Sequence, residues 1–215
     1  VPESVTVDIE KNAVTCSDDT FMHSFKPVFA TLLNHKTLTL EVLEALGRLM
    51  NIVTVGQGVG HKCIEVLQTW REATKVGKGA WREGDEPLIA TGLVSLFTHL
   101  PGGHIFVDKL TTTVIDLTNK LHTFKKLPSP SSPYILPLTV FLNKHPQACV
   151  DYFVARMGKT MYSEMFEAVL KLEEAKEVRA YLTSDEGTGK LMTAMLGIPL
   201  HLASLDGEAD SDVDP

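Results

Sequence analysis

Cysteine is scarce in this sequence: 215 residues contain only three, at positions 16, 63 and 149. Thiols so few and so far apart are typical of reduced cysteines in an intracellular protein and argue against a disulfide framework. We interpret Cys16, Cys63 and Cys149 as small apolar core residues. Without cross-links the chain must be stabilised by a hydrophobic core, and it is long enough to form one.

Long hydrophobic runs are absent as well. The best, LIATGLVSLF at 88–97, is broken by Thr, Gly and Ser, and it is far shorter than the ~20 residues that cross a bilayer. The first residues, VPESVTVDIEKNAV, contain no basic segment followed by an apolar one, so no secretory signal is expected. They also lack an initiator methionine, from which we expect a trimmed or excised segment. No membrane partner is predicted.

The sequence also lacks an excess of basic charge, because 27 acidic residues face 20 basic ones and the formal net charge is −7. Five of the acidic residues lie in the last ten positions, DGEADSDVDP, and the remaining 22 nearly balance the 20 basic residues. The body of the protein therefore offers no broad positive surface, and direct binding of DNA or RNA is not expected. We expect the acidic tail at 205–215 to be disordered.

Helical periodicity is what the sequence does contain, and strand alternation is nearly absent. Start signals at Thr39, Glu86 and Pro133 open successive helix pairs 47 residues apart. Repeats of ~40 to 47 residues made of helix pairs are typical of HEAT and armadillo proteins. We therefore predict an all-α fold in which antiparallel helix pairs stack as a HEAT-like α-solenoid. Such a fold offers long surfaces for other macromolecules.

Each expected helix has an apolar stripe with residues three or four positions apart. Pro27 either kinks the first of these helices or marks its true start. The stripes are Phe21, Phe25, Phe29, Leu32 and Leu33; Val42, Leu43, Leu46, Leu49, Met50 and Val53; Val59, Cys63, Leu67 and Trp70; Ile89, Leu93, Leu96, Phe97 and Leu100; Phe106, Leu110, Val114, Leu117 and Leu121; Leu138, Phe141 and Leu142; Cys149, Tyr152 and Phe153; and Tyr162, Met165, Phe166, Val169 and Leu170.

The predicted organisation has three parts. Residues 1–20 form an N-terminal extension, residues 21–204 form the helical repeats, and the acidic tail follows. A proline- and serine-rich connector at 124–133 interrupts the repeats. Within it, Ser129 and Ser132 each precede a proline, a context in which phosphorylation would add negative charge. The favoured interpretation is a stiff loop that leads into a helix.

The sequence GTGK at 187–190 raises the possibility of a phosphate-binding loop. A P-loop needs G-x-x-x-x-G-K-[ST] after a buried strand, but Ser184 replaces the first glycine and Leu191 follows the lysine. The residues before it favour a helix. We therefore predict a helix ending near Glu186, a turn at 187–189, and a solvated Lys190 in the first turn of the next helix.

Other candidate chemistry is also incomplete. VGQGVGHK at 55–62 lacks the last glycine of a dinucleotide motif and follows a helix, so a helix-to-helix turn is favoured. His61 and Cys63 have no further ligands with which to complete a zinc site. His99 and His104 are interpreted as exposed turn residues. Asp116, Asp151, Glu173 and Glu174 lie on expected helices, where a solvated face or a salt bridge is usual. We predict no catalytic residue, no metal ligand and no cofactor.

The segment SSPYILPLTVFLNKHPQACVDYFVAR at 131–156 resembles the HEAT-repeat region of the TRRAP family of pseudokinase scaffolds. WREGDEPLIATGLVSLFTHLP at 81–101 is similar to the preceding repeat of the same proteins. The likeness extends from about Thr37 to about Tyr162. The residues that carry it, taken as structural, are Pro133, Tyr134, Pro137, Phe141, Leu142, Asn143, Asp151, Tyr152, Phe153 and Arg156.

The resemblance implies a very large nuclear protein with a HEAT solenoid, a FAT region and a kinase-like domain without catalytic residues. It implies a non-catalytic scaffold of a histone acetyltransferase coactivator complex, with protein subunits and transcriptional activators as partners. No small-molecule substrate is expected. A generic HEAT-type adaptor in transport or trafficking is the alternative. We further expect Phe141 and Phe153 to be core residues that join two successive helices.

Overall fold

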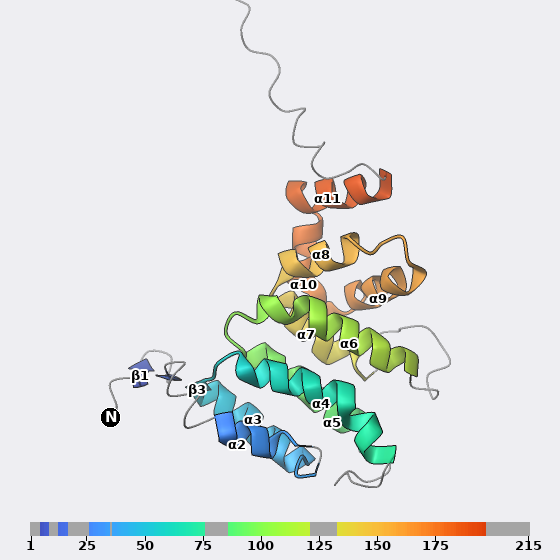
Figure 1. The fold of residues 1–215 in the computed structure, drawn as a ribbon. Helices are drawn as coiled ribbons and strands as arrows, with labels where there is room; N and C mark the ends of the chain where they lie inside the picture. The colour runs from blue at the N-terminus through green and yellow to red at the C-terminus, as the bar shows by residue number, and fades with distance from the viewer. Residues whose placement is uncertain are drawn as a thin grey trace, which may run out of the picture.

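A computed structural model describes six parts of the chain, namely residues 5–8, 13–16, 26–34, 36–75, 86–120 and 133–196. Most of these residues lie in helices that stack one above another along the molecule (Figure 1). The candidate phosphorylation sites Ser129 and Ser132, and the acidic tail at 205–215, lie outside the described residues.

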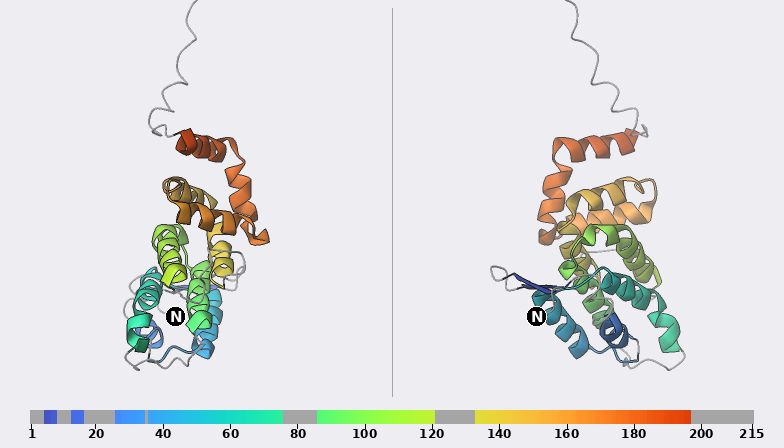
Figure 2. Two further views of the ribbon diagram at one scale, coloured as in Figure 1. Left: turned by 90° about the vertical axis from the view of Figure 1, so that its right-hand side faces the viewer. Right: turned by 60° about the vertical axis from the view of Figure 1, so that its left-hand side comes forward.

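The helices form two layers (Figures 1 and 2). The first layer contains α3 (Leu40–Ile52), α5 (Glu86–Leu96) and α7 (Ile135–Asn143) side by side, followed by the 3₁₀ helix η4 (Glu173–Ala175) and α10 (Lys176–Leu182). The second layer contains α2 (Lys26–Leu32), α4 (Gly58–Lys75), α6 (Val107–Lys120), α8 (Pro146–Val154) and α11 (Asp185–Leu196). Two further 3₁₀ helices, η2 (Phe97–His99) and η3 (Gly103–Phe106), connect α5 to α6, and α9 (Thr160–Leu170) packs against α7 and α8.

This arrangement confirms the predicted solenoid of stacked helix pairs. The helices of the first layer begin at residues 40, 86 and 135, so their starts are 46 and 49 residues apart, close to the predicted spacing. Each layer is continuous because its successive helices pack against one another, and contacts of α4 with α5 and of α6 with α7 join the two layers. A helix pair buries its apolar faces only by such stacking.

Local signals explain where several helices begin. The Thr39 hydroxyl accepts a hydrogen bond from the backbone N–H of Val42 at 3.3 Å and caps α3. Pro27 is the second residue of α2, and the first turn is the part of a helix that tolerates proline. Pro87 and Pro146 likewise lie in the first turns of α5 and α8.

The core lies between the two layers, and the predicted stripes supply most of it. The buried members are Phe29 and Leu33; Leu43, Leu46 and Met50; Val59, Cys63 and Leu67; Ile89, Leu93, Leu96, Phe97 and Leu100; Phe106, Leu110, Val114 and Leu117; Leu138, Phe141 and Leu142; Cys149, Tyr152 and Phe153; and Met165, Phe166 and Val169.

Two of the three cysteines are confirmed as buried free thiols. Burial raises the pKa of the Cys63 thiol to about 12, and it also raises the pKa of Cys149. At neutral pH both sulfurs are therefore protonated and unreactive.

Glycine allows two close approaches between helices. A Cβ atom at Gly60 would lie 2.6 Å from Phe106 Cζ, and one at Gly92 would lie 2.8 Å from Leu43 Cδ1. Gly60 belongs to the first turn of α4, so the last glycine of VGQGVG serves helix packing. The preceding residues, 55–57, connect β3 (Val53–Thr54), which follows α3 directly, to α4.

A small three-stranded sheet accompanies the helices. β1 (Val5–Asp8) pairs antiparallel with β2 (Ala13–Cys16), and β2 pairs in parallel with β3. Val14 lies opposite Val53 in that pairing. The two N-terminal strands have only four residues each, too few for their alternation to be distinguished by period from other short apolar runs. Part of the predicted N-terminal extension is thus attached to the helical array.

Candidate functional site

The residues that carry the family resemblance lie where α7 and α8 meet their neighbours. Tyr134, Pro137, Phe141, Leu142, Tyr152 and Phe153 are buried. Pro133, Asn143 and Arg156 are half-buried, and Asp151 is exposed. The burial of Phe141 on α7 and of Phe153 on α8 confirms their prediction as core residues. The burial of six of the ten indicates that their arrangement serves packing between helices.

Three consecutive residues of α8 reach three different helices. Successive side chains of an α-helix point about 100° apart, so Asp151, Tyr152 and Phe153 cover most of its circumference. They contact α11, α6 and α9 respectively. We call these three residues together with Arg156 the α8 junction.

Tyr152 and Arg156 attach α8 to α6. The Tyr152 hydroxyl lies 2.8 Å from Thr112 Oγ1, and Arg156 Nη2 donates to Asp108 Oδ2 at 2.5 Å. The Arg156 guanidinium also lies over the Tyr152 ring, 4.0 Å from its centroid. Burial raises the pKa of Tyr152 to about 12, so the hydroxyl is protonated at neutral pH. The contact combines a hydrogen bond, an ion pair and a cation–π interaction.

Phe153 attaches α8 to α9. Its ring stacks on Phe166 with centroids 4.6 Å apart and an interplanar angle of 16°. Both side chains are buried, so this stack belongs to the core of the C-terminal half of the array.

Asp151 attaches α8 to α11 through the GTGK segment, and here the sequence prediction is wrong. α10 ends at Leu182 and α11 begins at Asp185, so GTGK lies inside a helix and the turn is at 183–184. The Ser184 hydroxyl accepts from the Gly187 N–H at 3.2 Å and caps α11. Position 187 requires glycine, because the Cβ atom of any other residue would lie 2.1 Å from the Tyr181 carbonyl oxygen.

Lys190 is not solvated as predicted, since its side chain is only 20% exposed. Its Nζ donates to Asp151 Oδ1 at 2.7 Å and to the Tyr181 hydroxyl at 2.9 Å, and it lies 3.0 Å from Glu186 Oε1. Partial burial lowers the pKa of Lys190, but the bonds to Asp151, Tyr181 and Glu186 outweigh it and raise the pKa above the ordinary lysine value. A lysine already held by two carboxylates and a hydroxyl is occupied within the fold, so its role is to fasten α11.

Asn143 joins the end of α7 to the start of α10. Its Oδ1 accepts from the backbone N–H groups of Glu177 at 2.7 Å and Val178 at 3.2 Å. The residue before α10, Ala175, has no side chain that could cap the helix. Asn143 therefore supplies the N-terminal cap of α10 from another helix pair.

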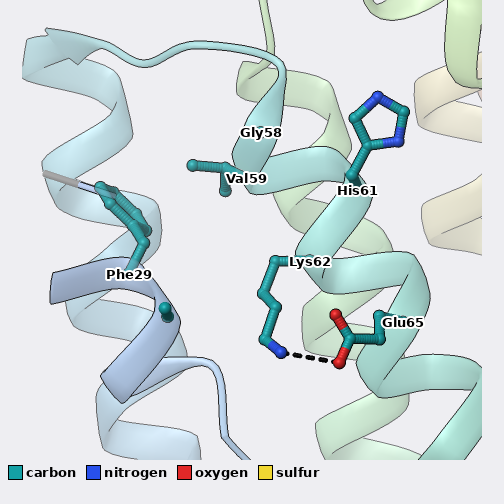
Figure 3. Close-up of a pocket in the computed structure, with 7 residues that line it drawn as sticks. Phe29, Gly58, Val59, His61, Lys62 and Glu65 are labelled. Carbon is teal, nitrogen blue, oxygen red and sulfur yellow. Dashed lines mark hydrogen bonds and ion pairs between the residues drawn. The ribbon is translucent and has the colours of Figure 1, made fainter. Parts of the chain in front are cut away.

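A hollow of about 310 Å³ lies between α2 and α4 (Figure 3). It is lined by Phe29 and Ala30 from α2 and by Gly58, Val59, His61, Lys62 and Glu65 from α4. Lys62 and Glu65 form an ion pair of 2.8 Å at its edge, and His61 points away from them (Figure 3). The hollow was not predicted from the sequence, because its walls come from two separate helices.

The possible metal pair of His61 and Cys63 is not brought together. Cys63 is buried in the core, whereas His61 is exposed and packs edge-on against Phe106 with ring centroids 5.0 Å apart. Across the described parts of the chain, no three His, Cys, Asp or Glu side chains gather closely enough to hold a metal ion. No helix in these parts is sufficiently long and apolar to cross a membrane.

Three histidines gather where η2, η3 and the end of α7 meet. His104 is exposed as predicted, but His99 is half-buried, and His145 joins them with its ring 6.2 Å from that of His104. Burial and the nearby Lys144 lower the pKa of His99; burial, His104 and Lys144 lower that of His145. His104 and His145 are 41 positions apart, so no local sequence pattern could predict that they lie near each other.

Comparisons with known proteins agree with this architecture. The sequence model of the family described as the "Tra1 HEAT repeat ring region" matches residues 14–205. The chain is 27% identical over 157 residues to "Probable transcription-associated protein 1" of Dictyostelium discoideum. It is 25% identical over 166 residues to the "Transformation/transcription domain-associated protein" of Mus musculus and 24% identical over 173 residues to that of Danio rerio.

These alignments cover 71%, 74% and 74% of the chain but only 3%, 6% and 4% of the respective relatives. The chain thus spans a small part of the length of the curated relatives it matches. No solved structure matches it.

Proposed function

Because the chain belongs to the Tra1 HEAT repeat ring family, whose sequence model matches residues 14–205, we propose that it is a non-catalytic scaffold segment of a transcription coactivator. The complex concerned is a histone acetyltransferase complex, and the segment acts by binding other proteins through its helical-repeat surfaces. This family match is the observation that carries the proposal, since the fold alone is shared by proteins of many functions.

The way the chain uses its polar residues supports a scaffold role. In the α8 junction and at Asn143, charged and polar side chains bind other helices of the same array. These bonds fix the positions of successive helix pairs, and a fixed array presents a constant surface to a partner. An α-solenoid binds macromolecules through such extended surfaces.

The proposed partners are protein subunits of the coactivator complex and transcriptional activators, and the proposed location is the nucleus. Relatives named for transcription support both. Nucleic acid is not a proposed direct partner, because the body of the chain is nearly neutral outside its acidic end. Membranes and small-molecule substrates are not proposed partners either.

Affinity capture tests the proposal. The tagged chain is incubated with nuclear extract and, separately, with cytosolic extract, and captured proteins are quantified by mass spectrometry against a HEAT-type solenoid of unrelated sequence. Acetyltransferase subunits should be enriched from nuclear extract, and histone acetylation activity should co-purify with the chain. Enrichment of transport or coat proteins, with no acetyltransferase subunit above the control, would instead establish a trafficking adaptor.

A further inference from the structure

The connection between α10 and α11 is only two residues long, Thr183 and Ser184. Figure 2 shows that α11 runs across the direction of α10, so the chain bends sharply at these residues. Thr183 nevertheless keeps helical dihedral angles, with φ −90° and ψ −1°. Neither residue is proline or glycine, and both fit into the interior of a helix. Little of the backbone therefore has to change for α10 and α11 to become one continuous helix.

α11 lies at one end of the stack and is attached to it by little apolar burial (Figure 1). Among its twelve residues only Gly187 is buried, while Leu191 and Ala194 are half-buried and pack against the core. A segment with few buried apolar contacts opens at a lower free energy than the core does. α11 can therefore separate from α8 and α10 while the rest of the array stays folded.

The surface of α8 and α10 that contacts α11, which we call the α11 site, is specific for its ligand. Asp151 Oδ1 and the Tyr181 hydroxyl accept from Lys190 Nζ at 2.7 Å and 2.9 Å. The Tyr181 carbonyl oxygen lies so close to residue 187 that only a glycine fits there. A helix bound at this site must therefore combine a glycine with a lysine three positions later. The α11 helix of a second copy of the chain has both.

We propose that two copies of this chain exchange α11. The bend at 183–184 straightens, α10 and α11 form one helix, and the α11 helix of each copy occupies the α11 site of the other copy. The second copy thus contributes its Lys190 to the pair with Asp151. Such an exchange is a low-cost route to a dimer, because the contacts of the closed chain form again between the copies. It does not depend on the proposed scaffold function.

Backbone hydrogen bonds favour the straight form. In the bent form the N–H of Ser184 bonds to the Tyr181 carbonyl, three positions earlier, at 3.0 Å, and the N–H of Gly187 bonds to the Ser184 hydroxyl at 3.2 Å. In a continuous helix each N–H group from 184 to 187 bonds to the carbonyl four positions earlier. This gain offsets part of the entropy that two copies lose when they associate. The protein concentration then decides between the closed monomer and the exchanged dimer.

Charge reversal in the whole chain tests the exchange. Lys190→Asp brings a like charge to Asp151 and Glu186, and Asp151→Lys brings a like charge to Lys190, so α11 of each variant is repelled by its own site. In an exchanged heterodimer of the two variants, both sites hold opposite charges. The heterodimer should have an association constant at least about tenfold larger than that of either variant alone. Light scattering measures it, and native mass spectrometry with one variant isotopically labelled identifies the heterodimer.

Two controls accompany the mixture. The double variant Lys190→Asp, Asp151→Lys restores an opposite pair within one chain, so it should dimerise no more than the unmodified chain. Lys171→Asp reverses a charge on α9 that pairs with Glu167 alone, and mixing it with Asp151→Lys should give far less heterodimer. Circular dichroism of each single variant verifies that the helical array is retained.

A second set of variants changes the bend and leaves the α11 site unaltered. The double variant Thr183→Ala, Ser184→Ala removes the hydroxyl that caps α11 and favours a continuous helix, so it should raise the dimer fraction. A short glycine linker inserted between 183 and 184 lets α11 return to its own site and should lower that fraction. In the unmodified chain the dimer fraction should rise with concentration.

Three results would overturn the exchange. The first is a mixture of the charge-reversal variants that stays monomeric. The second is a dimer fraction that neither change at the bend alters. The third is a dimer that forms equally well in every variant, since this would place the contact between the copies outside the α11 site.

Discussion

At the scale of single residues, several polar side chains of this protein bind other helices of the same chain. Lys190 has two carboxylates and a hydroxyl around it, and Arg156 has a carboxylate and an aromatic ring. A charged side chain that is partly buried and has several bonding partners contributes more to stability than an isolated surface ion pair does. Removal of such a residue therefore affects the attachment of a helix.

Lys190→Ala should lower the melting temperature by about 2 to 4 °C at low ionic strength. The partners Asp151 and Glu186 are 48% and 58% exposed, so salt screens the interaction, and the difference from the unmodified chain should shrink in 1 M NaCl. Calorimetry at both salt concentrations measures it. Lys171→Ala is the control, because Lys171 is 59% exposed and pairs with Glu167 alone. Equal effects of the two substitutions would contradict a special role of Lys190.

Phe153→Ala should reduce the free energy of unfolding by about 3 to 5 kcal/mol, through lost apolar burial and the cavity left beside Phe166. Phe141→Ala should cost a similar amount, because Phe141 packs edge-on against Phe97 with centroids 5.8 Å apart. Urea denaturation monitored by circular dichroism provides the values. Val140→Ala on the exposed side of α7 should change stability by less than about 1 kcal/mol. A loss below ~1 kcal/mol for Phe153→Ala would place its ring outside the core.

At the scale of helices, the sequence predicted the features that arise from residues close together along the chain. Apolar stripes identified α3, α5, α6, α8 and their buried sides, because a helix and its stripe arise from residues only three or four positions apart. Glycines were less informative. The two glycines on either side of Thr188 indicated a turn at 187–189, but both lie in α11, and residue 187 is glycine because the Tyr181 carbonyl oxygen lies against it. Such an approach exists only after folding, so local propensity could not show it.

The contacts of the α8 junction could not be predicted for the same reason. Asp108 and Arg156 are 48 positions apart, and Asn143 caps a helix that begins 33 positions later. The sequence resemblance marked Asn143, Asp151, Tyr152 and Arg156 as a group, but the helix that each contacts became visible only in the folded chain. The first two strands were missed because four alternating residues carry little periodic signal.

Asn143→Ala should destabilise the protein by about 1 kcal/mol, since the first N–H groups of α10 lose their acceptor. Asn143→Asp keeps an acceptor at the same place and should retain most of the stability. Hydrogen exchange should localise the effect of the alanine variant to α10. As a control, the exposed Asn51 on α3 can be replaced by alanine with little change. If exchange in α10 is unaffected by Asn143→Ala, the cap does not hold that helix.

Two glycine substitutions should have opposite signs. Gly60→Ala forces Phe106 and Leu100 aside, because a Cβ would lie 2.6 Å from one and 2.8 Å from the other, and we expect a loss of about 1 to 3 kcal/mol. Gly189→Ala meets nothing within 4 Å and lies on an exposed helix, so it should gain up to about 1 kcal/mol. Thermal unfolding of both variants gives the comparison. A stabilised Gly60→Ala would mean that α4 and η3 are not in close contact.

At the scale of the whole molecule, the two layers share one continuous core, so a perturbation at one junction alters global stability. The histidine cluster between η2, η3 and α7 is such a junction, with Lys144 donating to the Thr98 carbonyl at 2.7 Å beside it. No carboxylate contributes to the lowered pKa values of His99 and His145. Protonation of His99 therefore places a positive charge near Lys144, and protonation of His145 places one near His104 and Lys144.

The free energy of unfolding should fall as the pH is lowered below 6.5. His99 and His145 have folded pKa values below the ordinary 6.5, so between the folded and ordinary values the unfolded chain binds more protons, and acid favours it. About one pH unit or more above 6.5, both states hold mostly neutral histidines and this contribution is nearly constant. Urea denaturation at pH 7.5, 6.5 and 5.5 should show a smaller decline in the double variant His99→Gln, His145→Gln. Parallel declines in both proteins would assign the acid sensitivity to other groups.

The side-chain hydrogen bonds between helices also determine how the chain finds its fold. Those that join Gln68 to Thr113, Thr112 to Tyr152, Lys144 to Thr98, Arg156 to Asp108 and Lys190 to Asp151 span 39 to 48 positions, about one repeat each. The entropy lost when a loop closes depends on the length of that loop, and these five loops have nearly the same length. Each repeat added to such an array therefore adds a loop of about the same length and the same entropic cost. Because the loops do not become longer, the array can grow in evolution without slowing the formation of each helix pair.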